Sequence, residues 1–93
     1  MKSQEIIDFL IKLFKEYKAG IIDKEIVYER AEMLVTDNKL EYSENQNLKI
    51  VLEDILPDAC LIYVDEPGDK KEKEIGFYRA ICECEKLLKH ECH

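Results

Sequence analysis

Six carboxylates lie around one tyrosine in the middle of the chain, and residues of these types could together bind a partner. No Lys or Arg occurs between Lys49 and Lys70. Carboxylates without neighbouring bases, beside an aromatic ring, are typical of a surface that binds Arg and Lys side chains of another protein. A solvated face that only keeps the protein in solution is the competing interpretation, and the sequence leaves both open. The candidate partner-binding residues are Glu53, Asp54, Asp58, Tyr63, Asp65, Glu66 and Asp69.

Catalysis is not expected from these residues. Neighbouring carboxylates such as Glu53 and Asp54 diverge by about 100° around a helix, so they do not face a common substrate. Both histidines, His90 and His93, lie in the C-terminal tail, where a base is poorly held for activating a nucleophile. The three glycines form no phosphate-binding loop. We therefore predict a binding protein with no catalytic residue and no cofactor.

Cysteine and histidine also crowd the C-terminus, and zinc favours such ligands. Cys82 and Cys84 are two positions apart on an expected helix, which turns them to roughly opposite sides, whereas structural zinc sites place C-x₂₋₄-C in a turn. No metal site is predicted, although adventitious binding of divalent ions to the tail stays open.

The start of the chain lacks the pattern of a signal peptide, and the apolar runs are far shorter than the ~20 residues of a membrane span. We expect a cytoplasmic protein with free thiols.

Charge is distributed unevenly along the 93 residues. Residues 37–69 carry 9 acidic and 2 basic residues, so this stretch alone has a charge of −7, equal to the net charge of the whole chain. The parts before and after it are nearly balanced in charge. Such a surface repels the phosphates of nucleic acid and attracts a cationic protein. Direct nucleic-acid binding is therefore not expected.

The elements that position these residues are four amphipathic helices, each with an apolar stripe at the spacing of one helical face. The stripes are Ile6, Leu10, Leu13 and Tyr17; Val27, Ala31, Leu34 and Val35; Leu48, Val51, Leu52 and Ile55; and Phe77, Ile81, Cys84 and Leu88. Short connections between them predict one all-α domain over residues 1–93, a small antiparallel four-helix bundle. The outward face of the second helix is expected to carry Glu25, Glu29 and Glu32.

Capping residues set the expected bounds of the helices. The expected caps are Ser3, Asp23, Ser43 (in a capping box with Gln46) and Asp69 at the four starts, and Gly20 at the end of the first helix. The second helix is expected to end near Asp37 and Asn38. Pro57 is expected to end or kink the third helix, and residues 58–64 fit either a helix continuing past a kink or an extended buried segment.

Over most of its length the chain resembles the colicin D-type bacterial immunity proteins, including those that protect against contact-dependent inhibition toxins acting on tRNA. The resemblance is carried by the end of the first helix at residues 14–23, by Tyr-Glu-Arg-Ala-Glu-Met-Leu at 28–34, by the acidic third helix running into Pro-Asp-Ala-Cys-Leu-Ile-Tyr at 57–63, and by a closing helix. It implies a four-helix protein that covers the cationic cleft of a cognate nuclease toxin, with carboxylates standing where substrate phosphates would lie.

Two functions follow as expectations. The first is an immunity protein that neutralises a basic (t)RNA nuclease by electrostatically steered binding. The alternative is a helical protein-interaction or regulatory module that acts through an apolar surface, and weak self-association stays open. Their responses to salt differ, because ionic contacts weaken as salt rises and apolar contacts barely respond.

Overall fold

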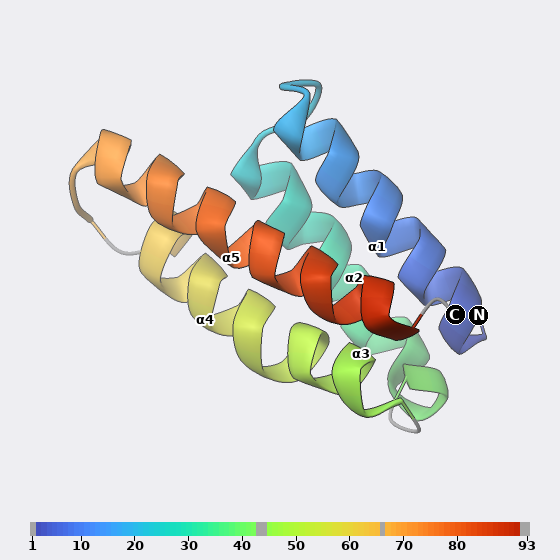
Figure 1. Ribbon diagram of the computed structural model, residues 1–93. Coiled ribbons are helices and arrows are strands. Elements are labelled where there is room, and N and C mark those ends of the chain that lie inside the picture. Colours follow the sequence, from blue (N-terminus) through green and yellow to red (C-terminus); the bar gives the residue numbers. More distant parts are fainter. Residues whose placement is uncertain (1, 43–44, 66, 92–93) are drawn as a thin grey trace.

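A computed structural model describes residues 2–42, 45–65 and 67–91, and within these ranges the chain is helical with no strand (Figure 1). The elements in chain order are α1 (Ser3–Lys18), α2 (Lys24–Tyr42), α3 (Gln46–Ile50), η1 (Val51–Ile55), α4 (Leu56–Cys60), η2 (Leu61–Asp65) and α5 (Lys70–Glu91). Because α3, η1, α4 and η2 follow one another without a break, we refer to residues 46–65 as the third helical segment. The prediction of an all-α chain with four helices is confirmed.

The connection between α1 and α2 forms as the sequence predicts. Gly20 has φ of 80°, which an L side chain rarely adopts, and it follows Ala19, the C-cap residue of α1. The N–H groups of Gly20 and Ile21 donate to the carbonyls of Tyr17 and Glu16, at 3.1 and 2.9 Å, which satisfies two carbonyls at the end of the helix. Asp23 Oδ1 accepts from the Ile26 N–H at 3.0 Å, so the expected N-cap of α2 is confirmed.

Two predicted caps and one predicted end are wrong. Ser3 lies inside α1 rather than before it, and Glu5 reaches back to the Lys2 N–H at 3.4 Å. The cap of α3 is Asn45, whose Oδ1 accepts from the Leu48 N–H at 3.0 Å; Ser43 and Glu44 lie outside the described residues. The second helix runs on to Tyr42, because no Gly or Pro follows residues 37–38 to stop it.

Pro57 does not end the third helical segment. Ahead of it, η1 is a π-helical turn in which the Leu56 N–H donates to the Val51 carbonyl, five residues back. Because proline has no N–H and its ring crowds the preceding turn, an ordinary α-helix tolerates it poorly in the interior. The wider turn accommodates the ring, and the chain continues as α4 and η2. Residues 58–64 are therefore helical, which selects the first of the two alternatives.

The apolar stripes meet in one core. Helix α1 contacts α2 and α5, and the third helical segment contacts both α2 and α5. Of the nine leucines and isoleucines in the four stripes, only Ile55 is partly buried; the buried ones are Ile6, Leu10, Leu13, Leu34, Leu48, Leu52, Ile81 and Leu88. The radius of gyration of 12.6 Å is close to the ~12 Å of a compact chain of this length. Among the described helices, none combines the length and apolar character needed to cross a bilayer.

Candidate functional site

The third helical segment presents two of the predicted carboxylates to solvent. Asp54 and Asp58 are both exposed, and their four-residue spacing puts them on one side of the helix. Within the described part of the chain, neither carboxylate has an ion-pair partner. Both carboxylates are therefore accessible to a cationic partner.

Glu53 is placed differently from its neighbour Asp54. Its side chain is half-buried, and its carboxylate lies 4.0 Å from Lys49 Nζ one helical turn earlier. An exposed pair of this kind contributes about 0.3–0.5 kcal/mol to stability. The charge of Glu53 is thus partly balanced within the helix, which makes it a weaker candidate contact than Asp54 or Asp58.

Tyr63 packs against α5. An ideal Cβ built on Gly76 would lie 2.8 Å from Tyr63 Cδ1 and closer still to Cε1 and Cζ, so the ring rests on the bare backbone of that glycine. The side chain is half-buried in this contact. The ring therefore joins the third helical segment to α5, a role that the sequence did not indicate.

The remaining predicted residues lie around the connection to α5. Asp69 is the N-cap expected from the sequence, since its Oδ1 accepts from the Lys71 N–H at 2.8 Å. Asp65 ends η2, but its side chain is outside the described part, and Glu66 lies outside the described residues altogether. The structure thus brings Asp54 and Asp58 together as exposed acids and gives Tyr63 and Asp69 contacts within the fold.

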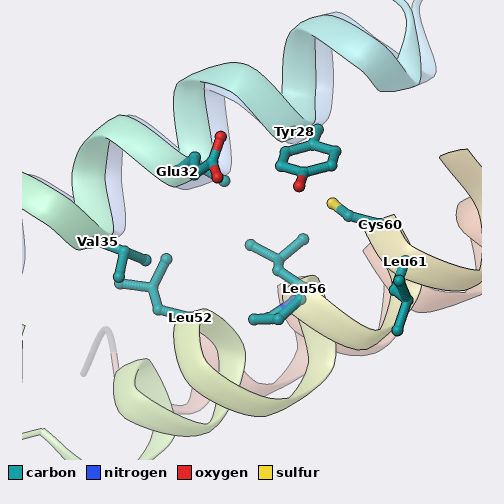
Figure 2. Close-up of a pocket in the computed structure, with 9 residues that line it drawn as sticks. Tyr28, Glu32, Val35, Leu52, Leu56, Cys60 and Leu61 are labelled. Atoms are coloured by element: carbon teal, nitrogen blue, oxygen red, sulfur yellow. The ribbon is translucent and has the colours of Figure 1, made fainter. Parts of the chain in front are cut away.

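A groove between α2 and the third helical segment was not expected from the sequence. It encloses about 350 Å³, and Figure 2 shows its two walls facing each other, with the Tyr28 ring and the Cys60 thiol pointing toward one another. The lining residues are Tyr28, Ala31, Glu32, Val35, Leu52, Leu56, Pro57, Cys60 and Leu61. Glu32, expected to face away from the core, therefore lies at an apolar groove. We refer to this feature as the α2–α4 groove.

One signal in the sequence could have indicated an exposed apolar surface here. The run from Ala59 to Val64 is apolar at every position, and a surface helix can bury only one face. The structure leaves Leu61 and Ile62 exposed, at 53% and 47% of their surface. Apolar area thus lies beside the carboxylates of the same helical segment.

Two acids of α5, Glu74 and Glu85, contrast with Asp54 and Asp58, because α2 and α1 supply lysines to them. Lys18 forms an ion pair with Glu85, whose side chain is only 6% exposed, and Lys24 pairs with Glu74. The hydrogen bond to the Glu85 carboxylate raises the pKa of Lys18, and its Nζ also lies 5.7 Å from the centre of the Tyr78 ring. These pairs balance the charges of Glu74 and Glu85.

Three of the four cysteines have side chains that the structure describes. Burial raises the pKa of the Cys84 thiol to about 12, so it remains protonated at neutral pH. Cys60 and Cys84 are buried, Cys82 is partly exposed, and none of the three is in a disulfide; Cys92 and both histidines have side chains outside the described part. Among the side chains that are described, no three Cys, His, Asp or Glu residues come together as a metal site.

Comparison with known proteins found no matching family model, no matching curated protein and no matching solved structure.

Proposed function

We propose that this chain is an immunity protein that binds a cognate bacterial (t)RNA nuclease toxin and covers its cationic active-site cleft with the acidic surface of the third helical segment. One observation carries the proposal. Asp54 and Asp58 stand exposed and without ion-pair partners among the described residues, in the stretch whose charge equals the net charge of the whole chain.

The physical mechanism is steered association followed by desolvation of paired charges. A negative face accelerates encounter with a cationic partner, and once bound, each carboxylate accepts hydrogen bonds from Lys, Arg or His of the toxin. The proposal includes an antiparallel four-helix bundle as the arrangement of the helices. Such a bundle would hold the carboxylates in place before binding and so lower the entropy cost of association. No turnover is involved, and neutralisation would take place in the cytoplasm, where tRNA is.

Charge reversal tests the proposal. Asp54→Lys and Asp58→Lys should abolish protection of cells that express the basic nuclease encoded beside this chain, and should weaken its binding in titration calorimetry. Truncating one partner of a buried charge pair costs about 2–5 kcal/mol, so each variant should lose at least tenfold in affinity. Circular dichroism would confirm that both variants remain folded.

The matched control is Glu25→Lys, which reverses an exposed charge in the first turn of α2. It should retain protection. If the reversals at Asp54 and Asp58 protect and bind like the unmodified protein, or if the neighbouring reading frame encodes no basic nuclease domain, the proposal is wrong.

A second function is favoured by a different observation. The α2–α4 groove and the exposed Leu61 and Ile62 would suit a helical interaction module that docks on its partner through apolar contacts alone. Repeating the calorimetry at higher salt separates the two functions. Binding through the carboxylates should weaken steeply, whereas binding through an apolar surface should hardly change.

A further inference from the structure

One wall of the α2–α4 groove is formed by α4 and the π-helical turns on either side of it. Leu52 comes from the π-helical turn η1, Leu56 and Cys60 come from α4, and Leu61 begins the second π-helical turn. Turns of this kind occur frequently at functional sites of proteins. The volume of about 350 Å³ lies at the low end of the ~300–1,000 Å³ range of ligand pockets. The groove therefore has room for a large apolar side chain.

Acidic residues lie at and beside this groove. Glu32 lines it, and Asp58, which does not line the groove, is an exposed neighbour of the lining residue Pro57. An adjoining hollow on α2 is also lined by Glu32, together with Glu29 and Asp37. Of the described residues that line the two hollows, none is Lys or Arg. Charge complementarity thus selects an occupant with basic residues around an apolar centre.

From this geometry we infer that the α2–α4 groove receives one large apolar side chain, aromatic or leucine, that is flanked by Lys or Arg on the surface of the cationic partner. The inference rests on the proposed function and extends the contact surface from the third helical segment to Glu32 on α2. An apolar anchor in a pocket with a polar rim is a common arrangement at interface hot spots. Burial of such an anchor should tighten binding about tenfold to a hundredfold.

Three synthetic peptides serve as probes of this inference. The first consists of Lys and Ala with one central Phe, the second replaces that Phe by Ala, and the third keeps the Phe but replaces Lys by Glu. Binding to the full chain would be followed by amide chemical-shift changes. The first peptide should bind best and should shift residues on both walls of the groove, whereas the second should bind about tenfold more weakly.

Two substitutions at neighbouring exposed positions provide the matched comparison. Leu61→Ser removes apolar surface at the groove, and Ile62→Ser removes a similar exposed area that does not line it. The advantage of the Phe peptide over the Ala peptide should shrink in the Leu61→Ser variant and persist in the Ile62→Ser variant. Glu32→Lys should weaken both basic peptides, while Glu25→Lys should leave them unchanged.

Each contrary result has a separate meaning. Equal binding of the two basic peptides at Asp54 and Asp58 would overturn the groove inference and leave the proposed function standing. If neither basic peptide shifts the amide signals of Asp54 and Asp58, the result would count against both the groove inference and the proposed function. Equal binding of the acidic Phe peptide would show that charge does not select the occupant. Self-association of the chain that Leu61→Ser abolishes and Ile62→Ser does not would make a second copy the occupant, and would also overturn the inference.

Discussion

Replacing Gly76 by Ala should destabilise the protein, although the same change stabilises most helices. Gly76 lies within α5, and Ala is favoured over Gly inside a helix by about 1 kcal/mol. At this position, however, the new Cβ would lie 2.8 Å from Tyr63 Cδ1 and closer to two other ring atoms, where ordinary contact begins near 3.4 Å. The Tyr63 ring would have to move outward by a large fraction of an ångström or more.

The size of the effect follows from these two opposing contributions. Overpacking of this kind costs about 1–3 kcal/mol, which exceeds the helix-propensity gain at all but its lower limit. We therefore expect Gly76→Ala to lower the free energy of unfolding by up to about 2 kcal/mol. Tyr63 is half-buried, so the ring can swing toward solvent, which keeps the cost within this range.

Urea unfolding followed by circular dichroism of four proteins would test this reasoning. They are the unmodified chain, Gly76→Ala, Tyr63→Ala and the double variant. In the Tyr63→Ala background the ring is absent, and Gly76→Ala should raise the free energy of unfolding by about 1 kcal/mol. The effect of Gly76→Ala should therefore change sign depending on whether Tyr63 is present. Comparison of Lys86→Gly with Lys86→Ala, at an exposed position of α5, measures the propensity contribution alone. If Gly76→Ala stabilises equally with and without the ring, the contact between Tyr63 and α5 is not as described.

Two further predictions concern ion pairs and pH. Lys18→Met should lower the free energy of unfolding by about 3 kcal/mol in urea titration, because it leaves the buried Glu85 carboxylate without its partner. Lys24→Met should lower it by no more than about 1 kcal/mol, because Glu74 is exposed. Equal effects of the two substitutions would contradict the difference in burial between Glu85 and Glu74. Stability should also fall as pH rises from about 9 toward 12, because burial raises the folded-state pKa of both Tyr17 and Cys84 to about 12. A group with a raised folded-state pKa contributes stability that is fully present below its unfolded-state pKa and is lost as pH rises through its folded-state pKa. Urea titrations across this range should show a smaller loss for Tyr17→Phe, and an unchanged loss would refute the assignment to Tyr17.

Local rules in the sequence were enough to predict the helices and some of their ends. A side chain recurring every three or four residues identifies the buried face whatever the neighbouring helix is, so residues such as Leu10, Leu52 and Ile81 could be assigned to the core. Gly20 and Asp23 act on backbone groups within a few residues of themselves, which is why their roles were also predictable. At Pro57 the sequence left two alternatives open, because it does not reveal that a π-helical turn accommodates the proline.

The candidate site was predictable only in part. The sequence indicated where negative charge is concentrated, and the exposed positions of Asp54 and Asp58 agree with that expectation. It could not indicate that Tyr63 packs on Gly76 or that Glu32 faces the same groove as Leu61, because each of these pairs joins two helices. Helical periodicity fixes which face of each helix is buried, but the register between helices depends on how all the apolar stripes pack at once. That register is a property of the tertiary structure, and it alone decided which residues meet.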